Sequence, residues 1–135
     1  MDKIVFIDAN IFLEIALGDI NSEKCSVLLN KIMRGEIKAY TSDFIVYACL
    51  LQMQYKTKDT KQMKNFVIFI NSIENLTILR PSLYDIGKAV EIAEKSKLDY
   101  GDSLVVSCMM SNNIKTLISQ DKDFNKIETI IRKDP

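Results

Sequence analysis

The stretch Ile4-Val5-Phe6-Ile7-Asp8-Ala9-Asn10 decides the fold of this chain. Four consecutive apolar residues that favour β-structure, 4–7, predict a strand buried on both faces, and such strands lie in the middle of parallel sheets. Asp8 follows this strand directly, and open α/β sheets place their ligand crevice at the carboxyl ends of the strands. Asp8 is therefore a candidate site residue. The alternative is that Asp8 only N-caps a helix over Ile11–Leu17, since Asp is a favoured cap.

The composition indicates one globular domain covering residues 1–135. Apolar residues make up 47% of the chain and charged residues 27%, and a chain of 135 residues can bury a sizeable core. Basic and acidic residues number 18 each, so the chain lacks the overall basic charge of a dedicated nucleic-acid binder. The apolar run that stops at Asp8 is too short for a signal peptide or a membrane span. We therefore expect a cytoplasmic protein that does not enter a membrane.

The absence of histidine from the sequence narrows the chemistry that the chain can perform. A Ser-His or Cys-His relay and a histidine-ligated zinc site are excluded. The three cysteines, Cys25, Cys49 and Cys108, stand singly in apolar helical stretches without C-x-x-C spacing, which predicts core thiols. Any chemistry must therefore rest on carboxylates.

Strand and helix patterns alternate along the rest of the chain. The sequence predicts helices over 11–17, 22–34, 44–55, 62–70, 82–97 and within 98–110, and further strands over 37–40, 76–79, 116–118 and 128–131. This order predicts an α/β fold: a three-layer α/β/α sandwich around a mostly parallel sheet of four to five strands, with right-handed crossovers.

A second acid, Asp102, opens a helix that is apolar nearly all round from Leu104 to Met110. A helix of this kind is expected to be buried, so the Asp102 carboxylate loses hydration and needs a dipole, a hydrogen bond or a cation. The alternative is an acid that only complements the helix dipole. Asp99, one turn earlier, is a weaker candidate, and the alternative is that it only N-caps this helix.

A third acidic group follows the strand over 116–118, in the segment Ser119-Gln120-Asp121-Lys122-Asp123. Turn chemistry alone explains Asp and Ser at such a place. However, this is again the carboxyl end of a parallel strand, on the same edge as Asp8. Clustered carboxylates repel unless they are protonated or hold a hard cation, so the sequence predicts a Mg²⁺ or Mn²⁺ site formed by Asp8, Asp102 and Asp121.

Four motifs together resemble the successive signatures of a PIN domain, in the group of VapC-type toxin ribonucleases: Ile4-Val5-Phe6-Ile7-Asp8-Ala9-Asn10, Tyr40-Thr41-Ser42-Asp43-Phe44, Tyr100-Gly101-Asp102-Ser103-Leu104 and Ser119-Gln120-Asp121-Lys122-Asp123-Phe124. The resemblance implies a Mg²⁺-dependent endoribonuclease for single-stranded RNA, usually dimeric and inhibited by a cognate antitoxin. By motif position it implies metal-site acids at Asp8, Asp102 and Asp121. It further implies orienting roles for Asn10 and Ser119, and an auxiliary acid at Asp123.

The sequence departs from this family at Ala48, where the second motif places a glutamate. Asp43 is not a replacement, because five residues along a helix turn it about 140° away from that face. One alternative is therefore a catalytically weakened or silent PIN-like module that binds RNA or a protein. Another is a receiver domain or an aspartyl phosphatase, but the sequence lacks the acid pair or D-x-D motif that these require.

The helix over 44–55 has more apolar residues than one buried face requires. Spacing puts Phe44, Ala48, Leu51 and Tyr55 on one face, which we expect to be buried. Cys49, Leu50 and Met53 lie off this stripe, and the helix over 22–34 likewise has more apolar residues than one face requires. We expect a second copy of the chain or the antitoxin to cover part of this surplus.

Overall fold

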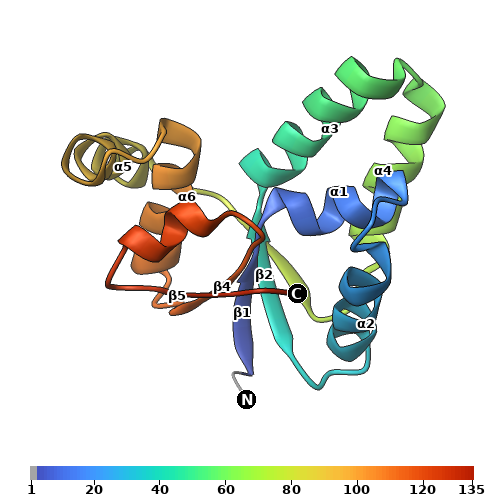
Figure 1. Cartoon of the computed structure of the whole chain (residues 1–135), viewed down its shortest axis with the longest axis horizontal. Helices are drawn as coiled ribbons and strands as arrows, with labels where there is room; N and C mark the ends of the chain where they lie inside the picture. The colour runs from blue at the N-terminus through green and yellow to red at the C-terminus, as the bar shows by residue number, and fades with distance from the viewer. Residues whose placement is uncertain (1–2) are drawn as a thin grey trace.

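Figure 1 shows a computed structural model of the chain, which describes residues 3–135. Within this range the strands are β1 (Ile4–Ile7), β2 (Lys38–Ser42), β3 (Leu76–Leu79), β4 (Thr116–Ile118) and β5 (Ile131–Lys133). The α-helices are α1 (Ala9–Leu17), α2 (Ser22–Met33), α3 (Asp43–Thr57), α4 (Thr60–Ser72), α5 (Leu83–Ser96) and α6 (Tyr100–Ser111). A short 3-10 helix, η1 (Lys122–Lys126), lies between β4 and β5.

The five strands form one parallel sheet with the order β3-β2-β1-β4-β5. β1 lies in the centre, and its residues Val5, Phe6 and Ile7 are at most 2% exposed. The prediction of a central strand buried on both faces is therefore confirmed for residues 5–7, whereas Ile4, at the start of the strand, is 50% exposed. The predicted α/β sandwich is also confirmed, with five strands and with every pairing parallel.

The chain changes direction across the sheet between β3 and β4. From β1 it moves through β2 to the edge strand β3, and it then returns to place β4 on the other side of β1. Right-handed crossovers put the helices of the two directions on opposite faces. Figure 1 shows α1 to α4 on one side of β1, and α5 with α6 on the other. β1 and β4 therefore flank the topological switch point, where open α/β sheets bind ligands.

Helix α6 is buried along most of its length, as its apolar sequence predicts. Every residue from Ser103 to Met109 is buried. The Asp99 carboxylate accepts a hydrogen bond from the Asp102 N–H at 2.9 Å and caps the helix. The three cysteines are also buried and unpaired, which agrees with their prediction as core thiols.

Helix α3 buries a different face from the one that spacing predicts. Ile45, Cys49 and Met53 are at most 4% exposed, whereas Leu51 and Tyr55 are 48% and 87% exposed. The prediction of the buried stripe was therefore wrong. Cys49 and Met53, which lie off that stripe, are buried within this chain and need no partner chain to cover them. Because α3 is apolar on more than one face, residue spacing alone does not fix which face packs on the core.

The last strand also lies later than predicted. β5 covers Ile131–Lys133, and residues 128–130 form the turn that precedes it. Arg132 fixes this polar strand, because its guanidinium donates to the Ser119 carbonyl at 2.7 Å and pairs with Asp134 at 2.9 Å. None of the helices in residues 3–135 combines the length and the apolar character that crossing a bilayer requires.

Candidate active site

The candidate site lies where β1 and β4 end side by side. Ile7 pairs with Ile118, so the residues that follow them leave the sheet at the same level. The backbone N–H of Asp8 donates to the Ile118 carbonyl at 3.1 Å and continues this pairing. The register therefore brings Asp8 next to Ser119, although the two are 111 positions apart in the sequence.

The Asp8 carboxylate is buried and held by three hydrogen bonds. Its Oδ1 accepts from the Ala9 N–H at 2.8 Å. Its Oδ2 accepts from the Ser119 hydroxyl at 2.7 Å and from the Asn10 side-chain amide at 3.3 Å. Asn10 is itself fixed, because its side-chain carbonyl accepts from the Gln120 N–H at 3.2 Å. Asp8 thus has a fixed orientation at the N-terminus of α1.

A pocket of about 280 Å³ opens beside Asp8 at this edge of the sheet. Asp102, from the first turn of α6, and Asp121, just beyond β4, line it together with Asp8. The other lining residues come from α1, from the loop after it and from α3: Ala9, Asn10, Leu13, Glu14, Asp19, Gln52 and Lys56. The three acids that the sequence singles out therefore line one pocket, although each comes from a different element.

Two predicted acids, Asp123 and Asp99, stay outside this pocket. Asp121 N-caps η1: its carboxylate accepts from the Asp123 N–H at 2.9 Å, and its own N–H donates to the Ser119 hydroxyl oxygen at 3.0 Å. Asp123 contributes only its backbone to this turn, and its side chain is exposed. Asp99 N-caps α6 and does not line the pocket either.

Burial and the neighbouring acids raise the pKa values of Asp8 and Asp102. Burial raises the pKa of the Asp8 carboxyl, the hydrogen bonds that it accepts lower it, and the charges of Asp121 and Asp99 raise it further. Burial also raises the pKa of Asp102 to about 7, and the charges of Asp99, Asp121 and Asp8 and a hydrogen bond with Asp121 act in the same direction. Near neutral pH, protonation of Asp102 therefore relieves part of this repulsion when no cation is present.

The donor set suits a hard divalent cation that keeps part of its water shell. All the charged donors are carboxylate oxygens, which favour Mg²⁺ or Mn²⁺. Within residues 3–135, no three acidic or thiol side chains lie close enough together to form a complete metal site by themselves. Because Mg²⁺ is usually bound through one or two carboxylates, with water and substrate phosphate oxygens completing its shell, the residues fit such an ion.

Helix α1 and the loop after it contribute two acids that sequence reasoning missed, Glu14 and Asp19. Glu14 lies one helical turn after Asn10, and its carboxylate accepts from the Gln120 side-chain amide at 3.2 Å and from the Asn21 N–H at 3.0 Å. The i, i+4 spacing from Asn10 is the sequence signal that identifies Glu14.

Helix α3 presents an amide and a cation to the pocket in place of a carboxylate. Gln52 and Lys56 line the pocket, and Ala48, one turn before Gln52, does not. Asp43 is the one acid in the α3 sequence, and it forms a 3.6 Å ion pair with Arg80 instead. The spacing of four residues from Ala48 is the signal that could have identified Gln52 and Lys56.

The parallel sheet and its acid-lined switch point define an α/β protein with a carboxylate site. The PIN domain family matches residues 5–130, and the chain belongs to this family. PIN domains are typically metal-dependent nucleases. A search of curated proteins finds no match for the chain.

Several solved structures of toxin–antitoxin systems have a similar fold. Mycobacterium tuberculosis VapC20, a toxin that cleaves the sarcin-ricin loop, is 11% identical with a TM-score of 0.77, over 93% of this chain and 96% of that one. Rickettsia felis VapBC2, bound to a DNA fragment from its promoter, is 17% identical with a TM-score of 0.74, over 97% and 98%. A toxin–antitoxin complex from Klebsiella pneumoniae is 14% identical with a TM-score of 0.69, over 94% and 95%. At these identities the likeness shows the fold alone.

Proposed function

We propose that this chain is a metal-dependent endoribonuclease and the toxin component of a type II toxin–antitoxin system, acting in the cytoplasm. The observation that carries the proposal is the pocket at the switch point, which Asp8, Asp102 and Asp121 line from three separate elements. Membership of the PIN domain family supports nuclease chemistry. The absence of histidine from the sequence agrees with a reaction that needs no nucleophilic side chain.

In the proposed reaction Asp8, Asp102 and Asp121 would form the metal site, with one or two of these carboxylates binding Mg²⁺ or Mn²⁺ directly and water and RNA phosphate oxygens completing its shell. When bound, the ion supplies positive charge to phosphate oxygens and lowers the pKa of nearby water. Ser119 and Asn10 keep the Asp8 carboxylate in one direction through bonds of 2.7 Å and 3.3 Å. Because the pKa of Asp102 is raised to about 7, a bound cation would favour the ionised form of this carboxyl.

Lys56 supplies the one positive side chain among the residues that line this pocket. Its ammonium is suited to contact an RNA phosphate next to the acids, because phosphate contacts fix the position of a nucleic acid without reading its sequence. Asp99, which lies outside the pocket, would act on the site through its charge and its cap of α6. Asp123, in the first turn of η1, would act through its charge alone.

Exposed apolar residues support the proposal of protein partners. Tyr47, Leu51 and Tyr55 are 64%, 48% and 87% exposed, and their spacing of four residues forms a continuous stripe on α3. We assign this stripe to a homodimer contact. A cognate antitoxin is the second proposed partner, and the toxin–antitoxin complexes among the similar structures support it.

A second candidate function is a catalytically silent module that binds RNA or a protein. Ala48 favours it, because the family's second-motif acid is missing and α3 offers Gln52 and Lys56 in its place. In that case RNA would bind without being cleaved, and divalent cations would bind weakly or not at all.

The proposal is tested by following cleavage of fluorescent single-stranded RNA with Mg²⁺, with Mn²⁺ and with a chelator. We expect cleavage with either ion, no cleavage with the chelator, and loss of at least a hundredfold in Asp8→Asn and Asp121→Asn. Glu94→Gln, an exposed acid on α5, is the matched control and should keep full activity.

Ala48→Glu separates the two candidate functions. If the chain is a weakened nuclease, an added carboxylate on α3 should increase the cleavage rate and the affinity for Mg²⁺. RNA binding without cleavage in the natural chain and in Ala48→Glu, together with no heat of Mg²⁺ binding in calorimetry, would support the silent module instead.

A further inference from the structure

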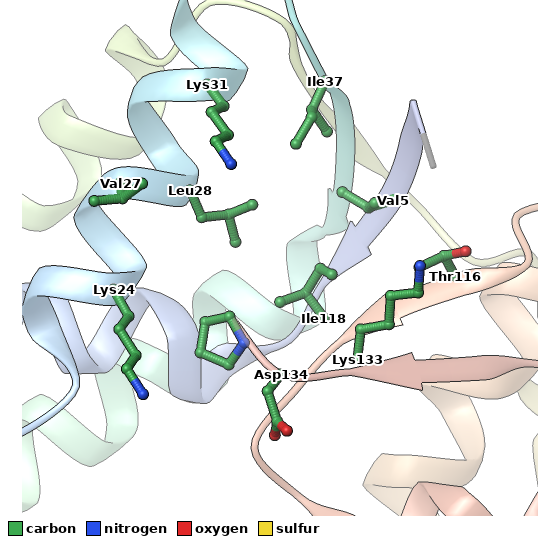
Figure 2. Close-up of a pocket in the computed structure, with 11 residues that line it drawn as sticks. Val5, Lys24, Val27, Leu28, Lys31, Ile37, Thr116, Ile118, Lys133 and Asp134 are labelled. Atoms are coloured by element: carbon green, nitrogen blue, oxygen red, sulfur yellow. The ribbon is translucent and has the colours of Figure 1, made fainter. Parts of the chain in front are cut away.

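A second cavity of about 340 Å³ lies between α2 and the sheet (Figure 2). It shares no lining residue with the acid pocket. Its walls come from α2, the residue just before β2, the strands β1 and β4, the edge strand β5 and the residues beyond it: Val5, Lys24, Val27, Leu28, Lys31, Ile37, Thr116, Ile118, Lys133, Asp134 and Pro135. Its volume falls within the range of small-molecule sites, which is roughly 300–1,000 Å³.

The strand register produces the apolar floor of this cavity. Phe6 pairs with Leu117, so their neighbours Val5 and Thr116 lie side by side on the opposite face of the sheet. Ile118 shares this face with Thr116, because side chains two residues apart on a strand point the same way. Lys133 pairs with Ile118 across β4 and β5, which places a lysine beside the apolar floor at the sheet edge.

Helix α2 forms the opposite wall with a repeating pattern. Lys24, Val27, Leu28 and Lys31 are spaced by three, one and three residues, so they share one face of the helix. The two lysines stand about 10.5 Å apart along the helix axis, at 1.5 Å per residue. The apolar pair between them continues the floor, so the cavity has apolar walls and lysines at its margins.

Lys31 is the feature that indicates the charge of a ligand. Its side chain is half-buried, and Figure 2 shows it extending from α2 toward the space between Leu28 and Ile37. Within residues 3–135 it forms no ion pair. A cation that is partly removed from water above apolar side chains is stabilised by an anion. The acid on this rim, Asp134, already pairs with Arg132 at 2.9 Å.

We propose that this cavity binds a small organic anion, with its apolar body on Val5, Leu28, Ile37 and Ile118 and its anionic group at the Lys31 ammonium. An alkyl or aryl carboxylate has this chemistry. A nucleobase does not, because its polar edges would lie against aliphatic side chains, and Thr116 is the one uncharged polar side chain among the lining residues. The proposal does not depend on nuclease activity, because the two pockets have no residue in common.

The test uses the whole purified chain in a chelator, with octanoate and 1-octanol as a pair of probes that differ in charge. The fluorescent anion anilinonaphthalene sulfonate is first bound to the protein, and each probe is then added to displace it. We expect octanoate to displace the dye at a concentration at least tenfold lower than 1-octanol does. Raising the salt concentration should weaken the binding of octanoate and leave the binding of 1-octanol unchanged.

Two variants locate the site. Lys31→Met should weaken the binding of octanoate about fivefold or more without changing the binding of 1-octanol. Val27→Trp should weaken the binding of both probes, because a large ring at this half-exposed rim position fills the entrance. Lys95→Met, on α5 at the other side of the sheet, is the control and should change neither. Thermal unfolding confirms that each variant is folded.

Three results would overturn the proposal. Equal displacement by octanoate and 1-octanol would mean that the cavity selects apolar bodies without regard to charge. Unchanged octanoate binding in folded Lys31→Met or Val27→Trp would mean that octanoate and the dye bind outside this cavity. Displacement by adenosine monophosphate or a short RNA, but not by octanoate, would assign the cavity to a nucleotide instead.

Discussion

Replacing Asp102 by Asn should stabilise the metal-free chain at alkaline pH and abolish metal-dependent cleavage. The amide has nearly the shape of the carboxylate but removes one negative charge from the pocket that Asp8 and Asp121 also line. The pKa of Asp102 is raised to about 7 by burial first and then by the charges around it. Burial of the Asp102 charge and its repulsion by the neighbouring acids therefore both oppose folding when no cation is present.

The sign follows from the direction of this pKa change. The folded chain holds the Asp102 proton more tightly than the unfolded chain, where the pKa is near 3.8. Stability from this group is therefore fully present below pH 3.8 and is lost as the pH rises through about 7. The whole rise would correspond to about 4 kcal/mol. Because Asp102 is only half buried, screening by solvent leaves about 1–2 kcal/mol.

The assay is urea unfolding of the natural chain and of Asp102→Asn, both in a chelator, at pH 5 and at pH 8. We expect the variant to gain about 1–2 kcal/mol at pH 8 and less at pH 5, so that comparing the two chains cancels other titrating groups. Added Mg²⁺ should stabilise the natural chain and not the variant. A variant that is less stable at pH 8, or a difference independent of pH, would refute the reasoning.

Three further predictions concern stability and assembly. Ser103 is fully buried and its hydroxyl has no hydrogen-bond partner in the described residues, so Ser103→Ala should raise the free energy of unfolding by about 1 kcal/mol, and a loss in urea unfolding would contradict this. Ser82 and Asp85 form a capping box with bonds of 3.1 Å and 2.9 Å, so Ser82→Ala should cost about 1 kcal/mol, and an unchanged unfolding midpoint would argue against it. Tyr55→Lys should convert the proposed homodimer to a monomer in light scattering without lowering the melting temperature, because Tyr55 is 87% exposed; a natural chain that is monomeric at high concentration would exclude the dimer.

The general fold was predictable because its strongest signals are local. The apolar run that ends at Asp8 could only be a buried strand, and the alternation of strands and helices then required a parallel sheet. The buried face of α3 was not predictable in the same way. Two apolar stripes of α3 are each able to pack on the core, and only tertiary packing determines which one does. The buried stripe contains Ile45, Cys49 and Met53, and the exposed stripe contains Leu51 and Tyr55.

The acids of the candidate site were predictable, but their neighbours were not. Asp8 and Asp121 follow the neighbouring strands β1 and β4, so strand order brings them to one edge, and Asp102 reaches the same pocket from the first turn of the buried helix α6. Whether Lys56 and Gln52 face the pocket depends on how α3 is rotated about its axis, and the predicted buried face of α3 was wrong. The hydrogen bond between Asn10 and the Gln120 N–H also requires the register of β1 against β4, which the sequence leaves open.

Two of the acids that line the pocket, Asp8 and Asp121, also N-cap helices, so capping and the candidate site use the same carboxylates. Asp8 N-caps α1, Asp99 N-caps α6 and Asp121 N-caps η1, so helical N-termini are directed at the region where the carboxylates gather. Backbone N–H groups and the dipole of a helix favour negative charge at its N-terminus. This compensation is partial, because the pKa of Asp102 remains raised to about 7. The caps therefore hold the carboxylates in place, and the repulsion that remains is what would favour binding of a divalent cation.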